Sequence, residues 1–292
     1  MTQRPAGRDL DALLANVRAE RVKKVAALAG RSARERTGLI LVEGPQAVRE
    51  LVTHRARHVR DLYVRDDVLG QRGAGADIAD AALTAGLHVH PVSQAVSSAL
   101  SVNSQGICAV ADADAIAQSG TAGAVNDGRA DEAGRIVAMA AILARVRDPG
   151  NAGAAIRVAD AAGAQVVVFA GDSVDVTNPK VIRASAGSVF HLPVVHVPHV
   201  AAAISWAHNR QLAVYAADVH GTAMLGSDSA IAVDTPHAWL FGNEAHGLDA
   251  TERSAADAIV RIPILGQAES LNLATAVAVC LYYSALNAGQ SG

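Results

Sequence analysis

The chain has 292 residues, enough for one large domain or two moderate ones, and a hydrophobic fraction of 51% can supply a sizeable core. Its two cysteines, Cys108 and Cys280, lie far apart in apolar runs, which excludes a disulfide framework and a cysteine-based zinc site. No apolar run reaches the roughly 20 residues of a membrane span. The first ten residues lack the apolar region of a secretory signal, so we expect a cytoplasmic protein.

A net charge of −3 conceals an uneven distribution of charge along the chain. Residues 1–60 contain 13 Lys or Arg against 6 Asp or Glu, which leaves an acidic remainder. Such asymmetry predicts that the basic part contacts a polyanion, although a solvated helical face is the alternative interpretation. The basic stretch 31–38 contains Arg31, Arg34 and Arg36 and is interpreted as a loop after a helix over residues 18–28.

The first third of the chain alternates between strand and helix patterns. Strands are predicted at 39–42, 61–64, 87–89 and 107–110, with helices at 46–52 and 76–85. This alternation predicts a small α/β domain over residues 1–112. Residues 113–134 are rich in Gly, Ala and acidic residues without periodicity, and we interpret them as a linker.

The second α/β alternation occupies residues 135–292. An apolar run at 135–143 is typical of a strand buried on both faces. Further strands are predicted at 165–170, 194–197, 212–216, 239–241 and 259–264, with helices at 151–162, 179–184 and 201–208. Helices between such strands predict a mostly parallel sheet, whose ligands bind at the carboxyl ends of the strands.

The last predicted helix, from Leu271 to Tyr283, is apolar nearly all the way round, with Ser270 as the expected N-cap. Such a helix must be covered on more than one side. It can belong to the core alone or be shared between the core and a partner subunit, and the pattern leaves both open.

Three glycine-containing loops follow predicted strands and open onto helices, where exposed backbone groups can hold a ligand. The chain has neither a GxGxxG sequence after a strand nor a phosphate-binding GxxxxGK[ST], which argues against ordinary dinucleotide or nucleotide binding. The three loops carry the motifs NAGAAIR at 151–157, LFGNEAHGL at 240–248, and IPI at 262–264 followed by SLN at 270–272.

In this order and spacing, the three motifs resemble those of the SpoU (TrmH-like) branch of the SPOUT RNA 2′-O-ribose methyltransferases. The segment 178–194 is similar to the middle region of that family, so the likeness covers residues 135–292. The stretch LVEGPQAVREL at 41–51 is similar to a small substrate-binding domain that resembles a ribosomal RNA-binding protein. The resemblance implies an α/β fold with a C-terminal trefoil knot, a homodimer, and S-adenosylmethionine as cofactor.

The resemblance also implies roles for individual residues. Gly242, Ile262 and Leu271 would contact the cofactor, chiefly through backbone groups. The implied catalytic residues are Arg157, which would assist deprotonation of the hydroxyl or stabilise the alkoxide, and the positioning residues Asn151, Glu244, Ser270 and Asn272. Taken alone, Asn151 and Ser270 are better interpreted as helix caps, and only their occurrence with the other motifs favours the functional role.

RNA phosphates would meet Arg31, Arg34, Arg36, Lys180 and Arg183, although Lys180 and Arg183 are also compatible with a solvated face. The histidines at 191, 196 and 199 alternate as in a strand and lack further ligands, so we expect no metal. The implied activity is ribose 2′-O-methylation of large-subunit ribosomal RNA. The alternatives are the same chemistry on tRNA and a non-catalytic RNA-binding or ribosome-assembly factor.

Overall fold

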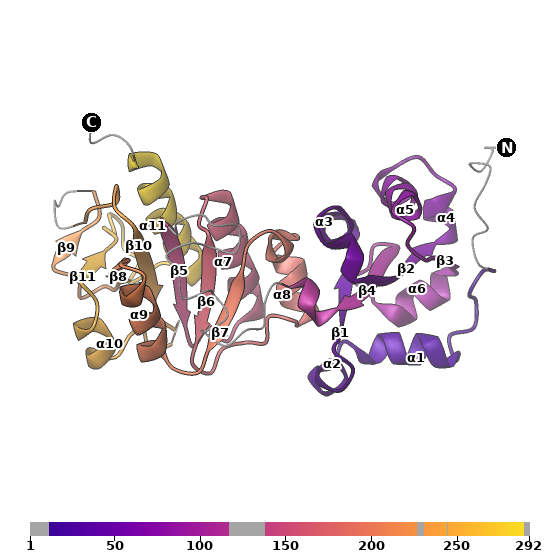
Figure 1. The fold of residues 1–292 in the computed structure, drawn as a ribbon, viewed down its shortest axis with the longest axis horizontal. Coiled ribbons are helices and arrows are strands. Elements are labelled where there is room, and N and C mark those ends of the chain that lie inside the picture. The colour runs from indigo at the N-terminus through magenta and orange to yellow at the C-terminus, as the bar shows by residue number, and fades with distance from the viewer. Residues whose placement is uncertain (1–11, 117–137, 227–230, 244, 289–292) are drawn as a thin grey trace. The chain divides into compact units, whose positions relative to one another are not determined.

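The computed structural model describes residues 12–116, 138–226, 231–243 and 245–288 (Figure 1). These residues form two compact units. Unit 1 comprises the chain up to Ile116 together with Asp175–His191. Unit 2 comprises the chain after Ile116 as far as Val174, and again from Leu192 onward. No helix within the described ranges is both long and apolar enough to cross a membrane.

Unit 1 is built on a four-stranded sheet in the order β1-β4-β2-β3. Its strands are β1 (Leu39–Glu43), β2 (Val59–Arg65), β3 (Val89–Val92) and β4 (Ile107–Asp112). β4 pairs antiparallel with β1 and β2, whereas β2 and β3 pair parallel. The sheet is therefore mixed, and the predicted α/β class of this part is confirmed.

Helices cover both faces of this sheet (Figure 1). They are α1 (Glu20–Ala27), α2 (Arg31–Thr37), α3 (Pro45–Arg55), α4 (Asp66–Leu69), α5 (Ala74–Thr84) and α6 (Gln94–Leu100), with 3-10 turns η1 (Ala56–His58) and η2 (Ala113–Ala115). Val22 of α1 and Val96 of α6 pack in one cluster with Leu41 and Tyr63 of the sheet. The loop predicted at 31–38 is wrong, because these residues form helix α2 and end at Gly38 in the left-handed conformation.

The segment Asp175–His191 belongs to unit 1 although it lies far along the chain. It contains α8 (Pro179–Ala184) and the 3-10 turn η3 (Ser188–Phe190), and α8 packs against β1. Arg183 donates to the Glu43 carboxylate at 2.5 Å, and Ser101 donates to the same carboxylate at 2.6 Å. Buried Glu43 is therefore paired, as a carboxylate inside a protein must be.

Unit 2 contains a seven-stranded parallel sheet in the order β7-β6-β5-β10-β8-β11-β9. Its strands are β5 (Met139–Ala144), β6 (Val166–Ala170), β7 (Val194–Val197), β8 (Ala213–Ala217), β9 (Ala223–Met224), β10 (His237–Phe241) and β11 (Ala258–Arg261). Every residue of β5, β6 and β10 is buried. The predicted parallel sheet is confirmed.

The helices of unit 2 are α7 (Pro149–Ala161), α9 (Val200–Asn209), α10 (Ala250–Ser254) and α11 (Leu273–Asn287). Ala238 and Leu240 of β10 share a cluster with Ile204 of α9. His237 and Trp239, which alternate with them, bond Ser284 of α11. Since successive strand residues point to opposite faces, α9 and α11 lie on opposite sides of the sheet.

Helix α11 begins two residues later than predicted. Its N-cap is Asn272, whose side-chain oxygen accepts N–H bonds from Ala274 and Thr275, so the prediction of Ser270 as the cap is wrong. The helix buries Val277 and Leu281, as a core helix does. On its other side large apolar side chains are exposed: Val279, Tyr282 and Leu286.

Candidate active site

A cavity of about 580 Å³ opens at the carboxyl end of the parallel sheet in unit 2. It lies among the residues that follow β8, β10 and β11 and the first turn of α11, the position expected for a ligand of a parallel α/β sheet. Apolar and polar side chains both line it: Asn151, Ala217, Asp218, Val219, Phe241, Gly242, Asn243, Gly247, Ile262, Ile264, Ser270, Leu271, Asn272, Leu273 and Ala276.

A hydrogen bond joins the first and third sequence motifs at this cavity. The Asn272 Nδ2 amide donates to Asn151 Oδ1 at 2.9 Å. Asn151 is not the cap of α7, because Asp148 is the N-cap and accepts the Asn151 N–H at 2.7 Å. The Asn151 side chain is thus left to face Asn272 and the cavity.

The loop after β10 is held by Asn243. Its Nδ2 donates to the Arg145 carbonyl at 2.7 Å, and its Oδ1 accepts the N–H groups of Ala245 and His246. Gly247 closes the loop by donating its N–H to the Asn243 carbonyl at 2.8 Å. One side chain therefore fixes both the shape of this loop and its distance from the end of β5.

Gly242 is required by this loop rather than by a ligand alone. A Cβ atom at position 242 would lie 2.4 Å from the Gly247 carbonyl carbon and 2.7 Å from the Leu248 nitrogen. Both are backbone atoms, so the loop would have to shift. The group that approaches position 242 closely is therefore the chain's own backbone.

Arg145 braces the same loop from the end of β5. Its guanidinium donates to both carboxylate oxygens of Glu252, and those bonds keep the pKa of Arg145 above its ordinary value. Glu252 also accepts the Asp249 N–H within a capping box that starts α10. Arg145 itself has a φ of 54°, an uncommon conformation for a side-chain-bearing residue.

A second cavity, of about 470 Å³, adjoins the first and shares Asn151 and Asn243 with it. Arg145, Arg147 and His246 also line it. Its two arginines suit a phosphate-bearing ligand, although Arg145 already pairs with Glu252, Arg147 pairs with Asp172, and Asp148 also lines the cavity.

The structure brings together most of the predicted site residues. Gly242, Ile262 and Leu271, and also Asn151, Ser270 and Asn272, line the larger cavity. Arg157 is exposed on α7 and lines neither cavity, and Glu244 lies outside the described residues.

Sequence reasoning missed Arg145, Asp218 and Asn243. Asn243 stood within a quoted motif, and Asp218 follows a predicted strand end, so both carried a signal. Arg145 also follows a predicted strand, at 135–143, and so carried the same signal.

The residues predicted to contact RNA occupy unlike environments in unit 1. Arg34 is buried, with its guanidinium bonded to Asp175, Thr177 and the carbonyls of Leu28 and Ala29, so we no longer propose it for phosphate contact. Arg31, Arg36 and Lys180 are exposed, while Arg183 is partly exposed and bonded to Glu43.

Comparison with known proteins places these features in a family. Residues 138–282 match the SpoU rRNA Methylase family, and residues 19–109 match the MRM3-like substrate binding domain. The chain is 31% identical over 251 residues to the 23S rRNA (guanosine-2′-O-)-methyltransferase RlmB of Bordetella pertussis, covering 84% of this chain and 96% of that protein. The chain belongs to the SpoU rRNA methylase family.

Two further relatives extend this result. The 23S rRNA (uridine(2479)-2′-O)-methyltransferase of Streptomyces viridochromogenes is 38% identical over 146 residues, which make up 49% of this chain and only about half, 51%, of that protein. The AdoMet-bound rRNA methyltransferase of Sinorhizobium meliloti has a TM-score of 0.75 and 25% identity, over 94% of this chain and 97% of its own. The likeness to that methyltransferase structure thus extends over nearly the whole chain.

The larger cavity has the chemistry that S-adenosylmethionine, the cofactor bound by that relative, requires. Phe241, Ile262 and Leu271 supply an apolar wall for an adenine ring. Asp218, whose side chain is only 7% exposed and lies 3.6 Å from the Arg253 guanidinium, supplies a carboxylate for hydroxyl or ammonium groups. The loops around Gly242 and Ile262 add backbone N–H and C=O groups. The residues present therefore fit this cofactor.

Proposed function

We propose that this chain is an RNA methyltransferase that methylates a ribose 2′-hydroxyl in large-subunit ribosomal RNA. S-adenosylmethionine would supply the methyl group. One observation carries the proposal: residues from three separate motifs meet at one cavity, where Asn272 bonds Asn151 beside Gly242, Ile262 and Leu271. The chain's similarity to 23S rRNA methyltransferases supports the same substrate class.

The two adjoining cavities suggest separate sites for the cofactor and for the RNA. The larger cavity would hold the cofactor, and the smaller one, lined by Arg145 and Arg147, would hold the phosphates that flank the target ribose. Asn151 lines both, so we propose that it positions the 2′-hydroxyl at their junction, with Asn272 orienting the Asn151 amide and Ser270 at the cavity edge. Glu244 is retained from the family motif as a positioning residue.

Arg157 needs a different account, because its own chain holds it away from both cavities. We propose a homodimer in which α7 and α11 form the interface and Arg157 serves the partner's cavity, where it would stabilise the developing alkoxide. The apolar side chains exposed on α11 support this interface, and Tyr282 of that face donates to the Ala161 carbonyl of α7 at 3.5 Å. We also propose that unit 2 contains the C-terminal trefoil knot that the resemblance implies.

We propose that unit 1 provides the affinity for RNA. In the proposed division of the chain, residues 1–112 bind the substrate and residues 135–292 transfer the methyl group. The match of residues 19–109 to a substrate binding domain supports this role. Arg31, Arg36 and Lys180 are the exposed cations that would contact phosphate. Arg183 is a weaker candidate because it is only partly exposed and is bonded to buried Glu43, whereas the Arg31–Glu35 pair is exposed. Replacing Arg31 and Arg36 by Gln should flatten the salt dependence of RNA binding, and an unchanged slope would refute their role.

The activity is tested by methyl transfer to ribosomal RNA from cells lacking the gene, with tRNA as the competing substrate. The wild-type chain should protect one ribose from alkaline cleavage. Asn151→Ala should lower the rate at least about tenfold while still binding cofactor, and Asn209→Ala, at an exposed position on α9, should not. Methylation of tRNA alone would favour the tRNA alternative. Absence of S-adenosylmethionine binding by calorimetry would favour the non-catalytic one.

A mixed dimer tests the role of Arg157. Arg157→Ala and Asn151→Ala homodimers should both be slow. A heterodimer of the two should regain activity if Arg157 acts across the interface, because one cavity then has its own Asn151 and the partner's arginine. A heterodimer as slow as the homodimers would mean that Arg157 acts at the cavity of its own chain or takes no part in the reaction.

A further inference from the structure

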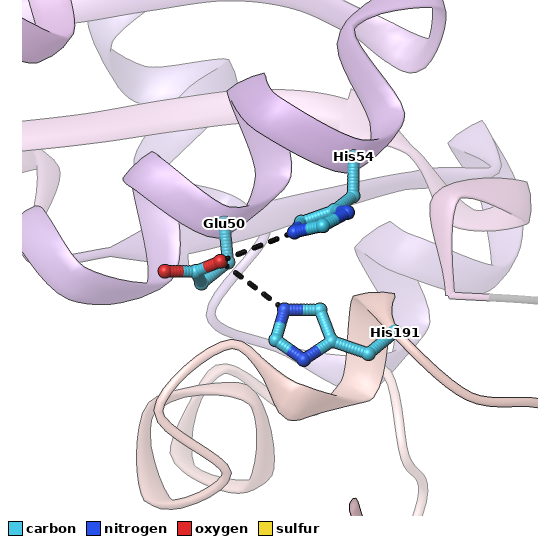
Figure 2. A group of neighbouring side chains, drawn as sticks. All are labelled: Glu50, His54 and His191. Carbon is cyan, nitrogen blue, oxygen red and sulfur yellow. Dashed lines mark hydrogen bonds and ion pairs between the residues drawn. The ribbon is translucent and has the colours of Figure 1, made fainter.

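Unit 1 contains a cluster of two histidines and a glutamate that the proposed methyl transfer does not use (Figure 2). Glu50 and His54 lie one turn apart on α3, and His191 directly follows η3. Glu50 Oε2 is 3.4 Å from His54 Nε2 and 3.2 Å from His191 Nε2. All three ligand atoms lie within 4.8 Å of one another, the one such group within the described residues.

The backbone holds these side chains together through contacts of its own. Gly187 has a φ of 97°, and a Cβ there would lie 2.5 Å from the Glu50 side chain, so α3 packs directly on the Gly187 backbone. The Arg55 guanidinium donates to the Phe190 carbonyl at 3.0 Å, one residue before His191. The cluster is therefore set by the packing of two segments that are already fixed.

The spacing of the ligand atoms suits a tetrahedral divalent cation. Bonds of roughly 2.0–2.2 Å in tetrahedral geometry place neighbouring ligand atoms roughly 3.3 Å apart. The two distances from Glu50 have that value. The two imidazole rings stand 4.6 Å apart at 60°, and their ligand nitrogens lie within 4.8 Å of each other.

The composition of the cluster narrows the choice of metal. Two imidazoles and one carboxylate are a ligand set typical of Zn²⁺, whereas Mg²⁺ and Ca²⁺ prefer oxygen ligands alone. The side chains remain partly open, with 25% of Glu50, 46% of His54 and 27% of His191 exposed, which leaves a path for the metal and a fourth position for water.

We propose that Glu50, His54 and His191 form a Zn²⁺ site. Its effect is structural: the metal ties α3 to the segment Asp175–His191, which matches the methylase family in sequence but packs in unit 1. Binding there stabilises unit 1 by selecting its folded form. The proposal does not depend on the methyltransferase activity.

The test is calorimetric titration of the untagged, chelator-treated full chain with ZnSO₄ near neutral pH. We expect one Zn²⁺ per chain, at least about tenfold weaker binding in His54→Gln and in His191→Gln, and unchanged binding in His208→Gln. His208 is the matched control, because its imidazole pairs with a single carboxylate, Asp257, at 3.1 Å in unit 2. Co²⁺ should show the visible absorption of a tetrahedral site in the wild type and control only.

Two results would overturn the site: wild-type chain that takes up no Zn²⁺, or His54→Gln and His191→Gln chains that bind it as tightly as the wild type. Melting provides a second readout that does not require the variants to match the wild type in stability. Added Zn²⁺ should raise the melting temperature of unit 1 in the wild type and in His208→Gln. An equal rise in the two cluster variants would also overturn the proposal.

Discussion

In both unit 1 and unit 2, polar side chains join segments that are far apart in the sequence. The kind of interaction differs between the two units. In unit 1, the segment Asp175–His191 is joined to the N-terminal elements by full charges, Arg34 with Asp175 and Arg183 with Glu43. In unit 2, neutral groups join the motifs at the larger cavity, since Asn272 bonds Asn151 and Asn243 bonds backbone, while the Arg145–Glu252 ion pair braces the loop after β10.

The difference bears on what each region can do. A buried ion pair costs a great deal to break, because the partner left behind is an uncompensated charge. An amide that bonds backbone or another amide holds a loop at lower cost and leaves a cavity that accepts a polar ligand. We therefore expect charge substitutions in unit 1 to affect folding, and substitutions at the cavity of unit 2 to affect ligand binding first.

Arg34→Ala should have the largest effect on stability, lowering the free energy of unfolding of unit 1 by about 3 kcal/mol. Burial by itself would raise the pKa of Asp175, but hydrogen bonds from Arg34 and Thr177 outweigh it and hold that pKa below its ordinary value. Without Arg34 the Asp175 carboxylate is left partly buried and lacks its charge partner. Hydrogen exchange of α2 amides measures the loss, because both tryptophans, Trp206 and Trp239, lie in unit 2 and do not report on unit 1.

Arg31→Ala on the same helix is the matched control for that prediction. Arg31 is exposed and pairs with Glu35 one turn away, so its loss should cost about 0.5 kcal/mol or less. Adding Asp175→Ala to Arg34→Ala should recover part of the lost stability by removing the unpaired carboxylate. If Arg34→Ala and Arg31→Ala are equally mild, the charged junction does not hold unit 1 together.

Gly242→Ala should weaken S-adenosylmethionine binding at least about tenfold while unit 2 still folds, because the new methyl group displaces the backbone of residues 247 and 248. Gly266→Ala, in the loop between β11 and α11, is the control, since nothing lies within 4 Å of a Cβ added there. Calorimetric titration with the cofactor compares them. Equal affinities would mean that the loop adapts and that its shape is not what selects the ligand.

The sequence was most informative where local pattern and burial agree. The sequence pattern predicted α8 and β7 at their observed bounds, and β6 to within one residue. Every residue of β6 is buried, and fully buried parallel strands carry a strong apolar signal. The same reasoning failed for residues 31–38. Their charges suggested a loop, whereas Arg34 turns inward to meet Asp175, a partner 141 residues away.

The candidate site shows the same limit. Family motifs identified Asn151, Gly242, Ile262 and Leu271, all of which line the cavity. Pairings between distant residues are set only by the folded backbone, so neither the Arg145–Glu252 brace nor the Glu50–His54–His191 cluster could be found from sequence spacing.

The smallest predicted effect concerns a buried histidine behind the cavity. Burial lowers the pKa of His237 below its ordinary value of 6.5, although the bond from its Nδ1–H to the Thr235 carbonyl opposes the shift. Between the folded and unfolded pKa values, His237 is therefore protonated in the unfolded chain and neutral in the folded chain. Stability from this group is fully present above the unfolded pKa and is lost as pH falls below it, by up to about 1.4 kcal/mol per pH unit.

Tryptophan fluorescence can follow this loss, because Trp239 and His237 both bond Ser284. Urea unfolding of unit 2 at about pH 7.5 and about pH 5.5 should show a smaller difference in His237→Gln than in the wild type, whatever the absolute stability of the variant. His208→Gln, which alters an exposed histidine in the same unit, should retain the wild-type difference. If His237→Gln shows the same stability difference between the two pH values as the wild type, groups other than His237 set the acid sensitivity of unit 2. The buried contacts of His237 would then contribute no more pH dependence than the neutral amides at the cavity.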